Sequence, residues 1–172
     1  MMALPTIISG TVWKVGDHVN TDILHPPAYF SLDEGRMKEG LKEGMERLKA
    51  GLKGADSGGG LVIVAGENFG CGSSRETSVR SLRICGVRAV IARSFARIFY
   101  RSLANLGIPP VESNGIQDLL KDGDLIHLAL KDGFIELSDK RRFPLSPLDP
   151  HIERILESGG LIPYLRREQH GV

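Results

Sequence analysis

The stretch that most constrains the fold is a short apolar run followed at once by a glycine-rich loop and a helix signal. Residues 61–65, Leu-Val-Ile-Val-Ala, are continuous, rich in β-branched side chains and bounded by glycine. This pattern predicts a strand buried on both faces, as in a parallel sheet. Ser73 and Glu76 have the S-x-x-E spacing of a capping box, with Ser73 as N-cap, which predicts a helix beginning near Ser74.

The loop between this strand and this helix has the features of an anion-binding site. Its glycines, Gly66, Gly70 and Gly72, permit positive φ angles and let a ligand or another chain segment approach the main chain. Free amides and the positive end of a helix dipole attract negative charge, and Arg75 adds a guanidinium that matches a carboxylate. A plainer interpretation is that Ser73 only caps the helix and Arg75 is solvated. Spacing alone leaves both interpretations open.

Established nucleotide and hydrolase loops fit this stretch poorly. No lysine follows as in a P-loop, Arg75 replaces the third glycine of G-x-G-x-x-G, and no G-x-S-x-G elbow can be placed on Ser73 or Ser74. The sequence therefore disfavours nucleotide binding and the hydrolase elbow.

The chain continues with alternating helix and strand signals. We expect a helix over 74–85 ended by Gly86, a strand over 87–91, a helix over 94–106 capped by Ser94 and closed by Gly107, and an extended segment over 108–111. This order implies parallel strands joined by right-handed crossovers. Ligands of such folds bind at the carboxyl ends of the strands, so the site is expected above Gly66.

The two ends of the chain add further elements to this parallel core. Residues 7–15 are β-rich and predict a strand. Towards the C-terminus the patterns predict short helices over 116–120 and 150–158, an antiparallel β region over 125–130, 133–137 and 140–143, and polar, frayed residues after Gly160. The expected fold class is α/β, with a parallel strand core plus an antiparallel β layer.

A loop and an arm lie between the first strand and the central one. Residues 20–29 contain a polar cluster and two prolines, which predicts an ordered loop; Asp22 is either an Asx-turn residue or a functional carboxylate, and His25 is expected at the surface. Residues 31–53 have helical periodicity, but four interior glycines predict a weak, broken or mobile helix. Together, residues 33–60 form either a mobile arm or lid, or a simple surface excursion.

Charge and cysteine content exclude several classes of function. The formal net charge is +1, which gives no basic face for nucleic acid or an anionic membrane. No membrane-length apolar run or secretory signal is seen, so a cytoplasmic location is expected. The chain has two cysteines, Cys71 and Cys85, which are too few for an iron–sulfur cluster, so any cluster must come from another chain. No metal site is predicted in this chain.

Three motifs in this order resemble those of one known family. Residues 66–76 (GENFGCGSSRE), 92–98 (ARSFARI) and 20–23 (NTDI) are similar to the small subunit of 3-isopropylmalate dehydratase, which is the swivelling domain of the aconitase superfamily as a separate chain. Residues 157–165 are similar too. The resemblance implies a single swivelling β/β/α domain over 1–172, as in the aconitase C-terminal domain.

The resemblance also implies an activity and a set of site residues. The family's hydro-lyases dehydrate a 2-hydroxydicarboxylate and rehydrate the alkene at the neighbouring carbon, and a large subunit holds the [4Fe–4S] cluster as Lewis acid. By resemblance, Ser73 is the catalytic base, Asp22 the carboxylate of the N-T-D motif near the active site, and Arg75 the substrate-binding cation. Ser74 supports the loop, and Gly72 is assigned to the substrate-binding set with it.

Substrate choice in this family depends on the segment after the first loop. Here that segment is Tyr29, Phe30, Ser31 and Leu32, with no arginine, so we expect it to bind an apolar substituent and the substrate to be 2-isopropylmalate, as in leucine biosynthesis. Homoaconitate-, dimethylmalate- or methylmalate-type substrates remain alternatives, and Arg36 or Lys38 could supply a charge from the arm. The expected partner is a large iron–sulfur subunit, in a heterodimer or heterotetramer. A silent binding module or a purely stabilising subunit would not need the serine and arginine at 73–75.

Overall fold

The computed structural model describes residues 7–48, 60–72 and 75–170. Its centre is a mixed sheet in the order β4-β3-β2-β1-β5-β6-β7. The strands of the parallel part are β1 (Ile8–Lys14), β2 (Leu61–Ala65), β3 (Val87–Ala92) and β4 (Pro110–Glu112). Antiparallel pairing continues from β1 to β5 (Leu125–Ala129), β6 (Phe134–Leu137) and β7 (Arg142–Pro144). The expected parallel core and antiparallel layer are confirmed, and they share one sheet through β1.

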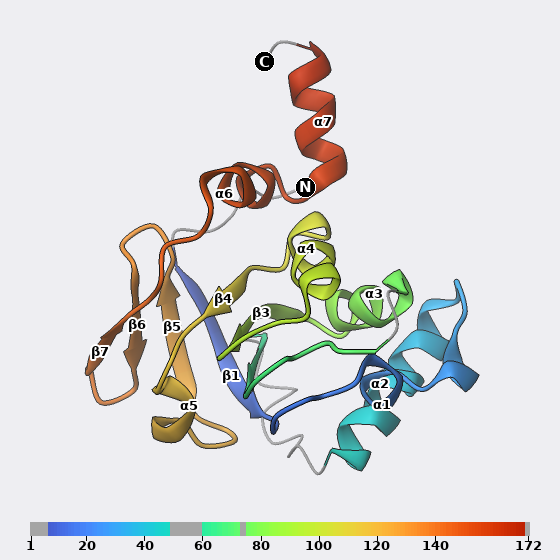
Figure 1. Ribbon diagram of the computed structural model, residues 1–172, viewed down its shortest axis with the longest axis horizontal. Coiled ribbons are helices and arrows are strands. Elements are labelled where there is room, and N and C mark those ends of the chain that lie inside the picture. The colour runs from blue at the N-terminus through green and yellow to red at the C-terminus, as the bar shows by residue number, and fades with distance from the viewer. Residues whose placement is uncertain (1–6, 49–59, 73–74, 171–172) are drawn as a thin grey trace.

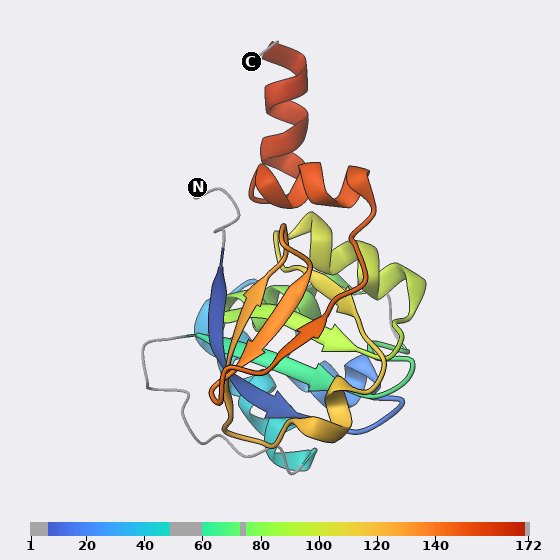
Figure 2. The same ribbon diagram turned by 90° about the vertical axis from the view of Figure 1, so that its left-hand side faces the viewer.

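Two apolar clusters explain why the central strand lacks polar residues. Alternate side chains of a strand point to opposite faces. Ile63 of β2 joins a cluster beneath the helices, whereas Val62 and Val64 join a cluster that the antiparallel strands cover. All five residues of β2 are buried, which confirms the prediction for residues 61–65. Figure 2 shows the sheet curling so that β5, β6 and β7 fold over one of its own faces.

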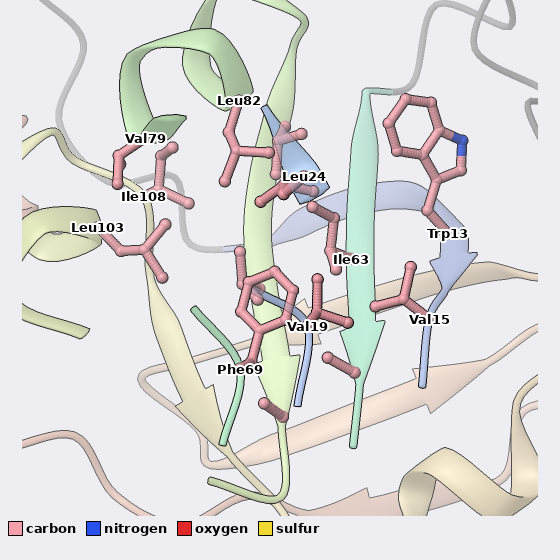
Figure 3. Packing of buried hydrophobic residues seen from close by; sticks show 14 of the residues in the cluster. Trp13, Val15, Val19, Leu24, Ile63, Phe69, Val79, Leu82, Leu103 and Ile108 are labelled. Atoms are coloured by element: carbon pink, nitrogen blue, oxygen red, sulfur yellow. The ribbon is translucent and has the colours of Figure 1, made fainter. Parts of the chain in front are cut away.

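The helices that position the site cover the other face of the parallel strands (Figure 1). They are α2 (Glu34–Arg47), α3 (Glu76–Ile84) and α4 (Arg97–Asn105), together with the short α1 (Thr21–Leu24) and the 3₁₀ turn η1 (Pro27–Tyr29). Figure 3 shows Phe69, from the loop after β2, among Leu24, Ile63 and Leu103 in the cluster under these helices. The glycine-rich loop is therefore anchored in the core by its own phenylalanine.

Three helix predictions need correction. Helix α3 begins at Glu76 rather than near Ser74: Arg75 occupies the N-cap position with extended backbone and no side-chain capping bond, so the capping-box register is wrong. Helix α4 begins at Arg97 after Ala96, not at Ser94. The Ser94 hydroxyl instead accepts a hydrogen bond from the Asn68 amide (2.8 Å) in the loop after β2. The C-terminal caps at Gly86 and Gly107, both with positive φ, are confirmed.

Residues 20–29 and 34–47 are more regular than predicted. Asn20 caps α1 by accepting from the Asp22 amide (2.7 Å), so part of the expected loop is helical. Helix α2 is continuous because its glycines are contact points: a Cβ on Gly44 would lie 1.9 Å from the Leu24 carbonyl oxygen. The expected break is therefore absent over α2, while the predicted weakness or mobility of this helix stays a prediction. The rest of the expected arm, residues 49–59, lies outside the described residues.

The chain ends in helices that leave the sheet. The short α5 (Ile116–Leu119) precedes β5, and α6 (Pro150–Glu157) packs on α4. Residues after Gly160, predicted to be frayed, form α7 (Leu161–His170), which projects from the body in Figures 1 and 2. This helix forms because its charged residues have good helix propensity. The Tyr164 ring also contacts the His151 ring edge-on, with centroids 5.6 Å apart. No helix in the described ranges is long and apolar enough to span a membrane.

Candidate active site

The segments that follow β1, β2 and β3 are joined by backbone hydrogen bonds into one platform. The Gly70 amide donates to the Val19 carbonyl (3.0 Å), and the Thr21 amide donates to the Cys71 carbonyl (2.8 Å). On the other side, the Phe69 amide donates to the Ser94 carbonyl (3.0 Å). These bonds bring the NTDI, GENFGCG and ARSFARI motifs together at the carboxyl ends of the parallel strands, as predicted.

Two glycines of the central loop are required by its geometry. Gly70 and Gly72 have φ angles of +79° and +105°, which L side chains rarely adopt. A Cβ on Gly72 would also lie 2.4 Å from the Asn20 side-chain oxygen, and one on Gly70 would lie 2.1 Å from the Phe99 ring. The loop therefore approaches α1 on one side and α4 on the other more closely than any larger residue allows.

Asp22 presents a buried carboxylate oxygen to this platform. It lies in the first turn of α1, where Asn20 holds its amide. Its Oδ1 atom is buried and has no hydrogen-bond partner within the described part of the chain. A buried polar atom without a partner is costly, and a substrate or another group that completes the bonding is one explanation for it. An oxygen of this kind is available to a ligand, and the functional role of Asp22 stays a prediction.

Arg75 stands exposed at the start of α3, and its guanidinium lies against an aromatic ring. The Cζ atom is 4.5 Å from the centre of the Phe30 ring. No ion pair of Arg75 with an acidic side chain occurs among the residues described. A guanidinium that contacts a ring through its face keeps its in-plane N–H donors available. Arg75 can therefore still bind a carboxylate.

The segment expected to select the substrate is fixed by neighbouring polar contacts. The Tyr29 hydroxyl donates to Glu43 on α2 (2.6 Å), and this bond raises the pKa of Tyr29 and lowers that of Glu43. The Ser31 hydroxyl accepts from the Asp33 amide (3.1 Å). Leu32, by contrast, is 80% exposed. Tyr29 and Ser31 thus hold the segment's shape, while Leu32 is free to contact a ligand or partner.

His25 is buried, which corrects the expectation of a surface histidine. Its ring has no exposed surface and stacks on Phe30, with centroids 5.6 Å apart and planes 13° apart. Neither ring nitrogen has a hydrogen-bond partner within the described ranges. Burial lowers the pKa of His25, so the imidazole is neutral near pH 7. It serves as an uncharged packing element beneath the site.

A cavity adjoins the glycine loop on the α4 side. It has a volume of about 330 Å³ and is lined by Gly70, Gly72, Arg75, Ala96, Arg97, Ile98, Phe99 and Ser102. Two arginines thus border a largely apolar hollow. A larger cavity of about 490 Å³ lies along the same stretch of α4, between Arg97 and Asp149, and contains none of the predicted site residues. The smaller cavity is the one lined by predicted site residues, Gly72 and Arg75.

Comparisons with known proteins agree with this geometry. A family model of the aconitase C-terminal domain matches residues 31–115. The chain is 38% identical over 169 residues to 3-isopropylmalate dehydratase small subunit 1 of Methanopyrus kandleri, covering 94% of each chain. It is 40% identical over 166 residues to the methanogen homoaconitase small subunit of Methanocaldococcus jannaschii, covering 95% of this chain and 94% of the relative. A solved structure of 3-isopropylmalate dehydratase from Methanocaldococcus jannaschii matches with a TM-score of 0.84 and 37% identity, covering 95% and 96% of the two chains.

The chain belongs to the aconitase C-terminal domain family. The family resemblance drawn from the three motifs is thereby confirmed, together with the mixed α/β fold class. In this aconitase-type domain the three motifs follow three adjacent parallel strands, so all of them lie at the same edge of the sheet.

The described part of this aconitase-type domain brings together most of the predicted site residues. Gly72, Arg75 and Phe30 lie close together, and Asp22 is joined to the loop through Asn20. Ser73 and Ser74 lie outside the described residues, so their roles stay predictions.

Sequence reasoning assigned no role to several residues of this site. His25 supports Phe30, Ser94 holds the loop after β2, and Arg97 borders the cavity beside Arg75. For Ser94 and Arg97 a signal existed, because both belong to the ARSFARI motif. For His25 there was none, because nothing local to a loop histidine tells whether distant residues will cover it.

The chain's own residues do not fit an iron–sulfur cluster. Such a cluster takes about three or four thiolates, and the sequence has two cysteines. The Cys71 thiol donates to the His18 carbonyl (3.4 Å), and burial raises the pKa of Cys85 at the end of α3. Within the described ranges, no group of three or more His, Cys, Asp or Glu side chains could hold a metal ion.

Proposed function

We propose that this chain is the small subunit of a hydro-lyase that isomerises 2-isopropylmalate to 3-isopropylmalate by dehydration and rehydration. The observation that carries the proposal is the joining of the three motifs at one sheet edge, where Asp22 and Arg75 have no ion-pair partner in the described chain. Relatives with 3-isopropylmalate dehydratase names over nearly the whole chain length support the same assignment.

In this proposal the chain supplies a base and carboxylate recognition. The reaction removes a proton from the carbon next to a carboxylate, releases the hydroxyl as water, and returns water at the neighbouring carbon. Ser73 is assigned as the base that takes the proton, by resemblance to the family. Arg75 offers two parallel N–H donors to the adjacent carboxylate, which fixes the carbon acid and stabilises charge that develops there.

Asp22 is suited to act beside that base. Its unpartnered Oδ1 atom can accept a hydrogen bond from a hydroxyl or water that enters the site. Because α1 and the glycine loop are joined by the Thr21 amide and the Cys71 carbonyl, the backbone that carries Asp22 keeps a fixed position relative to the loop. Proton transfer depends on such fixed geometry.

The proposal includes a large-subunit partner that contributes the iron–sulfur cluster. The cluster, when bound to that partner, supplies a Lewis acid for the hydroxyl group. Large apolar side chains stand exposed on the segments around the site: Ile23 is 43% exposed, Leu32 80% and Ile98 58%. In this proposal these three side chains form part of the surface that the large subunit covers. The small-subunit names of the relatives support the same partner.

The experiment is reconstitution of the two-subunit enzyme. The purified chain is mixed with an iron–sulfur large subunit, and conversion of 2-isopropylmalate to 3-isopropylmalate is followed. Each subunit alone should be inactive and the mixture active, and Ser73→Ala should abolish turnover without preventing assembly. Retained turnover in Ser73→Ala, or iron and labile sulfide copurifying stoichiometrically with this chain alone, would contradict the proposal.

A homoaconitase-type substrate is the second candidate, because a cation lies on the selecting segment. The Arg36 guanidinium donates to the Ala28 carbonyl (2.7 Å), directly before Tyr29. A homocitrate-type substrate carries a carboxylate where isopropylmalate carries methyl groups, and that carboxylate needs a positive partner. A relative at 40% identity is named a homoaconitase small subunit.

The two substrates can be separated by kinetics on the assembled enzyme. Relative to malate, which lacks the isopropyl group, burial of two methyl groups favours binding of isopropylmalate by about 1–2 kcal/mol, at about 0.8 kcal/mol per carbon. We expect kcat/KM to be higher for isopropylmalate than for homocitrate. A preference for homocitrate that disappears in Arg36→Ala would assign the substrate to the second candidate and leave the roles of Ser73 and Arg75 in place.

A further inference from the structure

Phe30 links the substrate-selecting segment, residues 29–32, to Arg75, two parts of the site to which the proposed function gives separate roles. On one side its ring contacts the Arg75 guanidinium, with the Cζ atom 4.5 Å from the ring centre. It also stacks with the buried His25 ring at 5.6 Å. The substrate-selecting segment and the carboxylate-binding arginine are therefore in direct contact, although they are 45 positions apart (75 − 30).

The residues next to the Phe30 ring form a close-packed interface with α2. His25 is fully buried, and a Cβ on Gly40 of α2 would lie 2.7 Å from its Nε2 atom and 2.5 Å from the Tyr29 Cβ. The backbone at Phe30 is fixed as well, because its amide donates to the Pro27 carbonyl (3.1 Å). Interiors packed this tightly do not deform continuously, so the ring has little freedom to move.

Arg75, by contrast, has little else to define its direction. It is exposed, it makes no side-chain cap to α3, and no hydrogen bond or ion pair of its guanidinium is found within the described ranges. A free arginine samples many rotamers, and binding a carboxylate would have to order them. The buried His25 is neutral, because burial lowers its pKa, so it adds no repulsion.

We propose that Phe30 is a positioning residue that orients the Arg75 guanidinium towards the substrate carboxylate. This inference rests on the proposed function, since it assigns Arg75 to the substrate. The ring attracts the cation through its face, and the in-plane N–H donors remain for the ligand. It also gives Phe30 a role other than direct contact with the substrate's methyl groups. Through this contact, a change in residues 29–32 would alter carboxylate binding as well as substrate choice.

The chain offers a matched control pair far from the site. Arg142 of β7 lies over the Phe134 ring of β6, with the Cζ atom 4.4 Å from the centre, and Phe134 is half-buried like Phe30. The two pairs share chemistry, distance and exposure. Only the Phe30 pair should matter for turnover.

The contact can be tested first without any activity. In the isolated chain, a phenyl ring facing the guanidinium shifts the Arg75 side-chain proton resonances upfield through its ring current. We expect that shift in the wild type and in Phe30→Tyr, and its loss in Phe30→Leu. Resonances that do not change in Phe30→Leu would overturn the inference whatever the enzyme's substrate is.

Kinetics of the assembled enzyme then test the consequence. Phe30→Leu should raise KM and lower kcat/KM about tenfold, as expected for a partly desolvated cation–π contact, with thermal stability close to wild type. Phe30→Tyr should keep kcat/KM close to the wild-type value, and so should the control variant Phe134→Leu. In an Arg75→Gln background Phe30→Leu should have no further effect, because the two residues act as one unit.

The outcomes separate this inference from the function on which it rests. No turnover of isopropylmalate or homocitrate by the wild-type complex would refute the proposed function, while the resonance test would still apply. Normal turnover in Phe30→Leu, or equal losses in Phe30→Leu and Phe134→Leu, would refute the positioning role alone. A loss in Phe30→Tyr as large as in Phe30→Leu would show that Phe30 acts by its shape instead.

Discussion

Charged side chains are treated differently in the antiparallel layer and at the carboxyl ends of the parallel strands. In the layer, Glu136 pairs with Lys140 (3.0 Å) and Arg142 (2.9 Å). At the parallel ends, the Asp22 Oδ1 atom has no partner and Arg75 contacts only an aromatic ring, as far as the described residues extend. At the parallel ends Arg93 also pairs with Asp118 (3.0 Å), but the charges of Asp22 and Arg75 are left available.

This difference marks the predicted site more clearly than any single motif does. Exposed ion pairs contribute little to stability, so their presence in the layer has no functional meaning by itself. A buried carboxylate oxygen without a partner is costly, and in the proposed function the substrate or a water completes its bonding. Besides the Arg93–Asp118 pair, the site edge is held by backbone bonds between loops and by the contact of α2 with α1.

The largest effect is expected from removing the charge at Asp22. Asp22→Asn should lower kcat of the assembled enzyme by roughly 10²- to 10³-fold, the usual range for a lost acid–base group. Stability should not fall, since the Asn20 bond to the residue 22 amide remains and a buried charge without a partner is removed. Kinetics and thermal unfolding of the same samples measure both effects. The matched change in the layer, Glu136→Gln, should leave kcat unaltered; a similar loss in both variants would erase the distinction between the two regions.

A smaller effect is expected from the contact that holds α1 under the site. Gly44→Ala places a Cβ against the Leu24 carbonyl and should lower the free energy of unfolding by about 1–3 kcal/mol through overpacking. Its control is Gly35→Ala, where the added Cβ meets only the Asp33 carboxylate oxygen at 3.3 Å. Denaturant unfolding of both variants is the measurement. Equal stability would mean that α2 does not pack closely on α1.

The smallest effect concerns the paired charges of the layer. Hydrogen bonds from Lys140 and Arg142 lower the pKa of Glu136 below its ordinary 4.5. A lowered folded-state pKa contributes stability above the unfolded pKa, and this contribution is lost as the pH falls through the folded-state pKa. The Tm difference between wild type and Glu136→Gln should therefore be constant above about pH 5 and shrink below about pH 4.5. A difference that grows on acidification would contradict this pairing.

Much of the fold could be predicted because its signals are local. The β-branched run at 61–65, the helix-ending glycines Gly86 and Gly107, and the alternation of strands and helices depend on neighbouring residues. The glycine conformations of the central loop could also be predicted, since Gly70 and Gly72 do adopt the positive φ angles that their residue type suggests.

The remaining features depend on residues that are distant in sequence. From the sequence alone Gly44 predicts a break in the helix, whereas in the structure it lets the Leu24 carbonyl approach α2 closely. Ser94 looks like a helix cap, yet its hydroxyl bonds to the Asn68 amide. The capping box at Ser73 and Glu76 was misplaced because Arg75 stays extended where its side chain reaches Phe30. Tertiary contacts outweigh local preference in each case.

The most direct test of the central claim is the kinetic effect of Arg75→Lys on the assembled enzyme. Lysine keeps the charge but cannot form two parallel bonds to a carboxylate. If Arg75 is left unpaired in order to bind the substrate carboxylate, kcat/KM for 2-isopropylmalate should fall at least about 30-fold, or about 2 kcal/mol. A fall of less than about threefold, well under one tenfold step of about 1.4 kcal/mol, would show that Arg75 is not a substrate ligand.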